Sequence, residues 1–489
     1  MNVRRRLAAM MLAALLMACA QTQALGRQPQ EPQLQPSEVE EVKRLAEEAR
    51  RLGAEGRNLE GAEVFERVIV LMAKGFGPEH PNLAVLIGQL GGVYHKLGLH
   101  ARAEPHYLRA LAIREKAFGP EHLLVAQSAN DLALLYAAKG DFAAAEPLLR
   151  RTLAIEEKLL GPAHPNVAAV LNNLGELYRY RADYAQAESL YLRALAIEEK
   201  ALGVDNPALA STLTNLGTVY YYKGDYARAE PLFLRGLAIV EKAKGPDSPE
   251  VVVSLNNLGA LYHNKGDVKR AEESYRRALS VEEKAYGPDK PEVAMMLNNL
   301  GKLYRETEQY DRAAPLFERA LAIREKMLGP DHPDTAEVLD NLSLLLQARG
   351  DYARAEALRR RALGIIEKIY GPQHPLVAGT LINFAALYNL KGDMARAVEF
   401  NERAAEINEH NLALVLSTGS EQQKQLYLDT LAGNTFGTVS LHVRNAPNDE
   451  RAARLALTAI LRRKGRSLDA MADQVGHSGD APLRKTACC

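Results

Sequence analysis

The sequence predicts an all-α fold, a solenoid of about nine stacked helix-turn-helix units, from three observations. First, one Gly column recurs every 42 residues without insertion or deletion, at Gly77, Gly119, Gly161, Gly203, Gly245, Gly287, Gly329 and Gly371. Second, an Ala column follows 26 residues after each of these, from Ala103 to Ala397. Third, apolar residues recur at steps of three and four, as on one face of an α-helix. One hairpin cannot bury that face alone, so neighbouring hairpins must stack.

One unit from the middle of the array shows how each hairpin is built. Val167, Leu171 and Tyr178 lie on one face of its first helix. Asp183 follows that helix and is expected to cap a second one, because Asp side chains accept from free N–H groups at helix starts. Gly203 is expected in the left-handed position that ends the second helix.

Small residues are expected where the two helices of a hairpin cross. Gly175 on the first helix and Ala187 on the second lack large side chains, so the two backbones can approach closely. Tyr178 is expected to fill the space beside them. The pair recurs as Gly217/Ala229, Gly259/Ala271 and Gly301/Ala313.

The resulting Leu-Gly-x-x-Tyr…Ala…Tyr/Phe…Ala signature resembles the tetratricopeptide repeat. Leu171, Leu213, Leu255 and Leu297 stand where that family often has Trp. The 42-residue unit is most similar to the kinesin-light-chain-like type, and the likeness covers residues 37–411. It implies a right-handed α-solenoid with units at about 37–76, 79–118, 121–160, 163–202, 205–244, 247–286, 289–328, 331–370 and 373–411. HEAT and armadillo repeats have similar periods but lack this Gly/Tyr/Ala spacing.

An Asn pair recurs in the first helices, in the motif LNNLG at residues 171–175, 255–259 and 297–301. At 100° per residue both Asn side chains point away from the apolar face. The second Asn forms a column, here called the ladder, at Asn173, Asn215, Asn257, Asn299, Asn341 and Asn383, with Gln89 and Asp131 in earlier units. The resemblance places the ladder in an inner groove, where its amides would hold the backbone of an extended peptide. Three other interpretations are repeat duplication without selection, bracing of the adjoining hairpin, and a solvated surface.

A second column beside the ladder varies from unit to unit. It contains Arg179, Tyr221, His263 and Arg305, and together with Tyr222 it makes the middle of the expected groove aromatic and basic. These residues are expected to tune which peptide binds. Whether that peptide is acidic stays open.

Composition and motifs indicate no enzyme, cofactor or metal. Lys+Arg and Asp+Glu both number 61, so no basic field indicates nucleic acid. No P-loop, zinc-protease or serine-hydrolase motif is present in the sequence. Five of the twelve His share one repeat position and are expected to be turn residues rather than metal ligands, at His80, His122, His164, His332 and His374.

The start of the chain predicts export. Residues 1–20 hold three Arg followed by an apolar stretch, which is a signal-peptide layout and shorter than the ~20 residues of a membrane span. Leu16-Met17-Ala18-Cys19 resembles a bacterial lipoprotein box, so residues 1–18 would be removed and Cys19 lipidated. Other cleavage points would release a soluble, secreted protein. Residues 21–36 are rich in Gln and Pro and predict a flexible tether.

The end of the chain departs from the repeat. Residues 412–473 are expected to form a helical connector, with one helix capped by Asn448 or Asp449. This segment is similar to the one that precedes the caspase-like CHAT domain in some bacterial proteins, and residues 474–489 are expected to be a disordered tail without that domain.

Three functional hypotheses follow. The leading one is a non-enzymatic scaffold in the periplasm or cell envelope that binds an extended peptide segment of a partner protein in its groove. The second is a regulatory remnant of a CHAT-type protease. The third is an envelope assembly factor anchored to the membrane by a lipid at Cys19.

Overall fold

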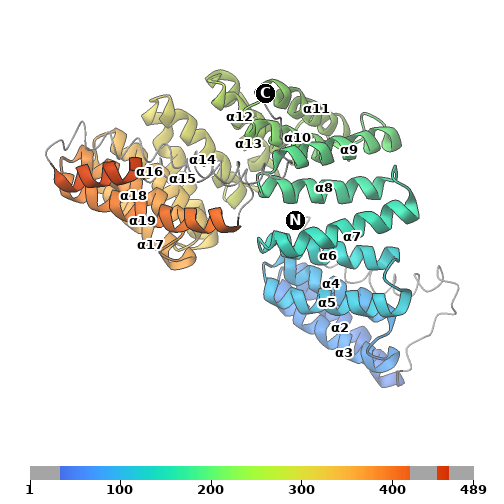
Figure 1. Cartoon of the computed structure of the whole chain (residues 1–489). Helices are drawn as coiled ribbons and strands as arrows, with labels where there is room; N and C mark the ends of the chain where they lie inside the picture. The colour runs from blue at the N-terminus through green and yellow to red at the C-terminus, as the bar shows by residue number, and fades with distance from the viewer. Residues whose placement is uncertain (1–33, 419–448, 462–489) are drawn as a thin grey trace, which may run out of the picture. The chain divides into compact units, whose positions relative to one another are not determined.

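The computed structural model describes residues 34–418 and 449–461, and all regular structure within these two ranges is helical (Figure 1). The chain divides into two compact units, Met1–Asn257 and Leu258–Cys489. The predicted signal segment, most of the tether and the tail lie outside the described residues. In the part of the chain that is described, no helix combines the length and the apolarity that a membrane crossing requires.

Consecutive helices pair into antiparallel hairpins, as the repeat predicts. The first unit holds α2 (Pro36–Glu55), α3 (Asn58–Phe76), α4 (Pro81–Lys96), α5 (His100–Phe118), α6 (Leu123–Ala138), α7 (Phe142–Leu160), α8 (Pro165–Tyr180), α9 (Tyr184–Leu202), α10 (Leu209–Tyr222) and α11 (Tyr226–Lys244). The boundary between units falls within α12 (Val251–Asn264). The second unit continues with α13 (Val268–Tyr286), α14 (Pro291–Glu306), α15 (Tyr310–Leu328), α16 (Pro333–Ala348), α17 (Tyr352–Tyr370), α18 (Pro375–Leu390) and α19 (Met394–Thr418). The all-α solenoid of stacked hairpins is confirmed.

The C-terminal part of the array runs further than predicted. α19 continues past residue 411, where the repeats were expected to end. Residues 450–461 form one more helix within the predicted connector. Its cap is Asp449, whose Oδ1 accepts from the Ala452 N–H at 2.9 Å, as one of the two predicted caps.

Polar side chains start the helices where the sequence predicted turns. Asp183 Oδ1 accepts from the Gln186 N–H at 3.2 Å and caps α9. Ala182 before it has φ 57°, a left-handed conformation that Gly adopts in most other hairpins and Glu308 in one. The five predicted turn His residues cap first helices, each accepting through Nδ1 from the N–H two residues ahead at 3.1–3.3 Å. Their role as turn residues is therefore confirmed.

The Gly column that ends each hairpin adopts a conformation other than the predicted one. Gly203 has φ 88° but ψ 155°, which lies outside the left-handed helical region. Residues with a Cβ are essentially excluded from that region, so the position still requires Gly. The next hairpin begins a few residues later, because this conformation turns the chain from α9 toward α10.

The close approach inside a hairpin also involves a ring of the second helix. A Cβ built on Gly175 would lie 2.8 Å from the Tyr191 ring, and one on Gly217 would lie 2.6 Å from the Phe233 ring. The first helix therefore lies directly on the face of an aromatic side chain of the second helix. Ala187 is fully buried, and the Tyr178 hydroxyl reaches Glu146 of the preceding hairpin.

The Gly and the ring occur together from α4 onward. Hairpins with Gly on the first helix have Tyr or Phe on the second, as Gly91/Tyr107, Gly175/Tyr191, Gly217/Phe233, Gly259/Tyr275 and Gly301/Phe317. Hairpins with another residue at the Gly position have no ring at the second, as Ala133/Leu149, Ser343/Arg359 and Ala385/Asn401. The two positions therefore behave as one packing unit.

Successive hairpins are joined by a Tyr–Glu contact. Tyr178 donates through its hydroxyl to Glu146 Oε1 on the preceding hairpin at 2.5 Å, and Arg181 pairs with the same carboxylate at 2.7 Å. The contact recurs as Tyr94–Glu66, Tyr136–Glu104, Tyr220–Glu188, Tyr304–Glu272 and Tyr388–Glu356. An apolar core continues across the seams, and one cluster joins α2 through α6. Burial of this continuous core drives the stacking.

Candidate functional site

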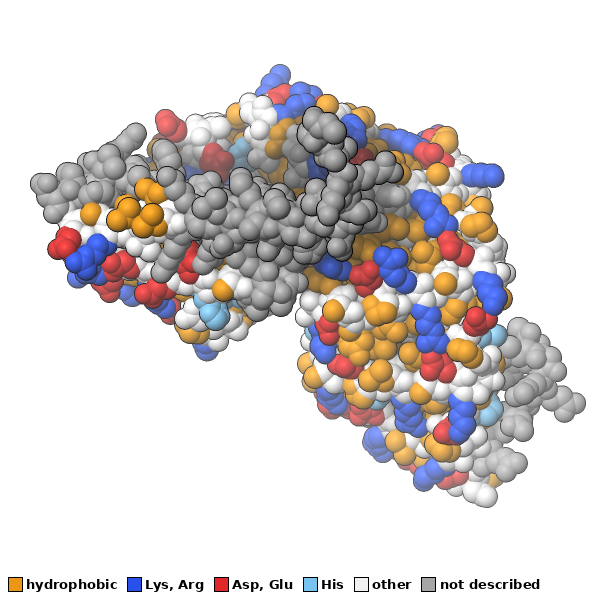
Figure 2. Space-filling view, viewed as in Figure 1, with side chains coloured by type: hydrophobic (Ala, Val, Ile, Leu, Met, Phe, Trp, Pro, Cys, Tyr) orange, Lys and Arg blue, Asp and Glu red, His pale blue; other side chains and the backbone are white. Residues whose placement is uncertain are grey.

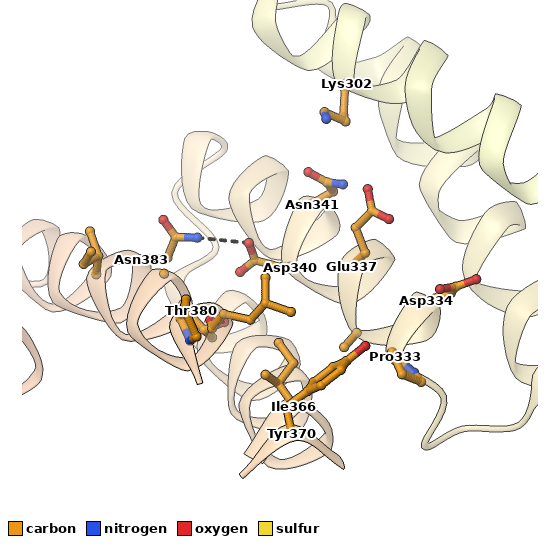
Figure 3. Close-up of a pocket in the computed structure, with 15 residues that line it drawn as sticks. Lys302, Pro333, Asp334, Glu337, Asp340, Asn341, Ile366, Tyr370, Thr380 and Asn383 are labelled. Carbon is orange, nitrogen blue, oxygen red and sulfur yellow. Dashed lines mark hydrogen bonds between the residues drawn. The ribbon is translucent and has the colours of Figure 1, made fainter. Parts of the chain in front are cut away.

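The ladder lies on the first helices and bonds across the seams between hairpins. Asn173 Nδ2 donates to Asn130 Oδ1 of the preceding first helix at 2.8 Å. In the second unit Asn341 Nδ2 donates to Asn298 Oδ1 at 3.0 Å. Asn383 Nδ2 donates to Asp340 Oδ2 at 3.0 Å, and the dashed line in Figure 3 marks this bond. At these positions the ladder amides brace neighbouring hairpins.

The first Asn of the pair lies in the seam rather than facing away from it. Asn298 is 3% exposed and donates to Glu337 Oε1 of the next hairpin at 3.0 Å. Asn172 donates forward to Thr212 Oγ1 at 2.7 Å and to Glu198 Oε1. The expectation that both amides point outward is wrong for this member, because the helical-wheel argument considered only the apolar face within one hairpin. The seam to the next hairpin covers a further sector of the helix.

Asn215 and Asn257 differ from the bracing amides. Neither side chain makes a hydrogen bond within the described first unit, and both residues are half-buried. The Oδ1 atom of Asn172, which matches the acceptor of the bracing bonds, is buried without a partner in the described chain. Two ladder amides of the first unit therefore keep all their donors and acceptors for other contacts.

Within residues 34–418, three hollows border ladder residues, each between the first helices of successive hairpins. The first, of about 660 Å³, contains Gln89 and Asp131 among its lining residues. The second, of about 410 Å³, contains Asn215. The third, of about 700 Å³, contains Asn341 and Asn383 and lies within the second unit (Figure 3). The ladder column therefore borders concave surface in both units.

The third hollow has a polar side and an apolar floor. Figure 3 shows Glu337, Asp340 and Asn341 on α16 and Lys302 on α14, with their polar ends toward the space between the helices. Ile366 comes from α17 beneath them. A hollow of this kind can accept a chain that offers both hydrogen bonds and apolar side chains.

The predicted specificity column forms two local clusters. In the first unit the Arg179 guanidinium lies 4.3 Å from the centre of the Tyr180 ring, a cation–π contact. Tyr221 and Tyr222 form an edge-to-face pair, with ring centres 5.5 Å apart. Arg179 also lies 3.6 Å from Glu176.

In the second unit, the two basic residues of this column, His263 and Arg305, both contact the carboxylate of Glu306. His263 Nε2 lies 2.8 Å from Glu306 Oε2, and Arg305 Nη2 lies 2.7 Å from Glu306 Oε1. The structure thus brings His263 and Arg305 together, as the column predicted, and also places a counter-ion between them. A ligand that binds this basic pair must compete with Glu306.

A column of buried charges on the second helices was not predicted. The floor position next to the ladder carries Arg114, Glu156, Glu198, Val240, Glu282, Arg324 and Ile366. Glu198 and Glu282 are each 7% exposed, and burial raises the pKa of both carboxyls. Each charged member of the column has one buried polar atom without a partner in the described chain. The signal was present in the sequence, because charged residues recur every 42 positions within an otherwise apolar helix face.

Arg359 is a second buried charge that was not predicted. It occupies the ring position of its hairpin and is fully buried. Its Nε lies 3.2 Å from Asp340 Oδ1, and its Nη1 donates to Gln347 Oε1 at 3.0 Å and to the Asn383 carbonyl at 2.7 Å. Ser343 stands where the hairpins with a ring have Gly, and this difference in the sequence could have indicated that the ring position holds another residue.

Surface charge shows no preference for one sign. On the face shown in Figure 2, Lys and Arg are mixed with Asp and Glu over the described helices of the first unit. This agrees with the equal numbers of basic and acidic residues in the chain.

A family model described as tetratricopeptide repeat matches most of the described chain. The matched stretches are residues 52–116, 84–158, 133–200, 166–242, 208–284, 250–326, 316–365 and 334–410. The chain belongs to the tetratricopeptide repeat family. The predicted family is confirmed, and the paired helices and 42-residue spacing of this tetratricopeptide repeat protein follow from it.

Several solved structures are similar to this tetratricopeptide repeat protein. BtubC (BKLC) from P. vanneervenii is 24% identical over 48% of this chain and 92% of its own, with a TM-score of 0.40. A putative kinesin light chain from Podosopora anserina with nearly identical TPR-like repeats is 24% identical over 42% of this chain and 97% of its own, with a TM-score of 0.38. A STAND protein with a tetratricopeptide repeat sensor from Pyrococcus horikoshii is 19% identical over 77% of this chain and 56% of its own, with a TM-score of 0.49. No curated protein sequence matches the chain.

Proposed function

We propose that this tetratricopeptide repeat protein is a non-enzymatic scaffold that binds an extended peptide segment of a partner protein along the ladder. The observation that carries the proposal is that three hollows along the first helices of the described chain each contain ladder residues. The family supports the broader statement that such repeats serve protein–protein interaction.

Bracing and peptide binding are compatible at the same amide. A side-chain amide has two N–H donors and an oxygen that accepts two hydrogen bonds. The bond from Asn173 to Asn130 uses one N–H of Asn173. The oxygen and the second N–H stay available, and the brace holds them in one orientation. A peptide that binds such an amide does not have to order it, which reduces the entropy cost of binding.

The amides without a brace offer the cleanest test. We suggest selecting ligands from a displayed library of random peptides on the wild-type chain, then measuring their affinity by fluorescence anisotropy. The variant with Asn215→Ala and Asn257→Ala is expected to bind at least about tenfold more weakly, as loss of hydrogen bonds worth ~1 kcal/mol each implies. Its unfolding transition is expected to stay unchanged, because neither side chain bonds within the described first unit.

A matched control is available on α8. Asn166→Ala removes an exposed amide that lies away from the ladder, at the start of that helix. This variant is expected to bind the selected peptides as the wild type does. If the ladder variant also binds them with wild-type affinity, the ladder does not contact the peptide and the proposal fails.

We also propose that the scaffold is exported to the cell envelope and held there by a lipid on Cys19. The support is the sequence alone, with three Arg, an apolar stretch and the Leu-Met-Ala-Cys motif. The residues concerned lie outside the described ranges.

A further inference from the structure

The hollow of about 660 Å³ in the first unit exists because two residues of α4 lack side chains. Gly88 and Gly92 both line it. The equivalent positions of the next hairpin carry Asn130 and Leu134. A Cβ on Gly92 would meet only the Tyr107 hydroxyl, at 3.5 Å, and one on Gly88 only the Ala110 Cβ, at 3.8 Å. Both are ordinary contacts, so packing does not require Gly at either position.

Unsatisfied polar atoms converge on this hollow. Gln89 Oε1, His100 Nδ1 and Arg114 Nε are buried without a hydrogen-bond partner in the described chain, and all three residues line it. Buried polar groups are rarely left unpaired in native proteins, because each one loses its hydrogen bonds to water. Three such atoms around one space could be satisfied together by a polar molecule that enters it.

Arg114 presents one edge of its guanidinium to the hollow. The residue is 6% exposed, and its Nη1 donates to Ser128 Oγ at 2.8 Å and to the Leu124 carbonyl at 3.0 Å. All its hydrogen bonds within the described chain run through Nη1, so the Nε–Nη2 edge is free there. Two parallel N–H donors on one edge match the two oxygens of a carboxylate.

Asp131 supplies the opposite charge without meeting Arg114. Within the described residues its carboxylate makes neither a hydrogen bond nor an ion pair. Burial raises the pKa of its carboxyl to about 6, and the charge of Arg114 offsets only part of that effect. A buried carboxylate in this state gains most from a cation with several N–H donors.

The remaining walls suit the body of a small organic molecule. The His95 and Tyr107 rings lie edge to face with centres 6.4 Å apart. Val85 and Leu134 add apolar surface. The volume lies within the range of ligand pockets in proteins, ~300–1,000 Å³.

We propose that this hollow binds a small zwitterion of the amino-acid class, a free α-amino acid or a dipeptide. Its carboxylate would bind the free edge of Arg114, and its ammonium would donate to Asp131 and to Gln89 Oε1. A ligand with one charge leaves the other buried group uncompensated, so the two opposite charges together select a zwitterion. This site is separate from peptide binding along the rest of the ladder.

The first test is calorimetry and thermal unfolding of the full chain with the twenty protein amino acids and their dipeptides at millimolar concentration. At least one compound is expected to bind with a saturable isotherm and to raise Tm as ligand linkage requires. Its N-acetyl derivative, which lacks the ammonium, and its amide, which lacks the carboxylate, are each expected to bind at least tenfold more weakly. Comparing the binding of free amino acids with that of dipeptides shows which of the two classes of ligand the hollow binds.

Two variants separate ligand binding from folding. Gly92→Leu fills the hollow with the residue that the next hairpin carries, and it is expected to abolish binding while raising Tm, because Gly is a poor helix former. Gly364→Ala in α17, where a Cβ would meet nothing within 4 Å, is the matched control and should raise Tm without changing binding. Asp131→Asn is expected to fold and to lose discrimination between the amino acid and its N-acetyl derivative.

The outcomes decide the proposal in either direction. It is overturned if no compound in the panel binds, if single-charge derivatives bind as tightly as the zwitterion, or if Gly92→Leu binds like the wild type. The Asn215/Asn257 ladder variant should bind the zwitterion normally, so failure here and failure of peptide binding are distinguishable.

Discussion

Replacing Gly217 by Ala places a methyl group against the buried ring of Phe233. The new Cβ would lie 2.6 Å from Cε1 and 2.8 Å from Cδ1 of the ring, whereas carbon atoms pack at about 3.5–4.0 Å. Phe233 is 1% exposed, so the ring has no open space to move into. Overpacking of this kind costs about 1–3 kcal/mol, and the better helix propensity of Ala returns about 1 kcal/mol. The expected net loss of unfolding free energy is up to about 2 kcal/mol.

The repeat itself suggests the compensating change. The hairpin of α6 and α7 has Ala133 and Leu149 at the equivalent positions. Phe233→Leu alone is expected to cost about 1–2 kcal/mol through the cavity it leaves. The double variant with Gly217→Ala should cost less than the sum of the two single changes, by about 1–2 kcal/mol, because the added methyl occupies space that the ring has left.

The assay is urea unfolding followed by far-ultraviolet circular dichroism, with hydrogen exchange measured on α10 and α11 to localise the effect. Gly364→Ala is the control for helix propensity, since a Cβ at that position would meet no atom within 4 Å, and it should be stabilising. The argument is wrong if Gly217→Ala stabilises the chain as Gly364→Ala does. Strict additivity in the double variant would equally refute the coupling between Gly and ring.

Three further predictions concern single positions. Asp131→Asn is expected to stabilise the ligand-free chain by up to about 3 kcal/mol above pH 6. The folded carboxyl has a pKa of about 6 against an ordinary 3.8, so the stability of the wild type falls as pH rises between those values. The gain should vanish below about pH 4, and urea unfolding at several pH values would show this. Asn341→Ala removes a buried bracing bond and should cost about 1–2 kcal/mol in the same assay, against almost nothing for Asn215→Ala. Mass spectrometry of the mature chain should find a lipidated Cys19 at the N-terminus, and an unmodified N-terminus at any other residue would contradict the lipoprotein interpretation.

The hairpins were predictable because their signals are local. Asp183 and the His caps act on N–H groups two or three residues away, so a sequence pattern of a few residues determines where each helix begins. The period of 42 residues then repeats the same hairpin along the chain. Family and fold follow from these two observations.

The contacts between helices were harder to predict. Gly175 was correctly identified as a close-approach position, but the Tyr191 ring that lies against it was not predicted. Comparing units in the sequence would have indicated the ring, since Gly and ring disappear together. Asn298 was expected to point outward, because a helical wheel does not include the seam to the next hairpin. The hollow beside Gly92 requires three helices to form, and no single segment predicts it.

The buried Arg359 makes one hairpin of the repetitive array different from its neighbours. Nearly identical units can dock onto the wrong neighbour during folding, since any apolar face fits any other. Asp340 and Gln347 lie on the other helix of the same hairpin, whereas the Asn383 carbonyl reaches the guanidinium only when α18 is the following helix. A mispaired hairpin would leave the buried guanidinium without that carbonyl, so the wrong order of stacking costs a hydrogen bond to a charged group.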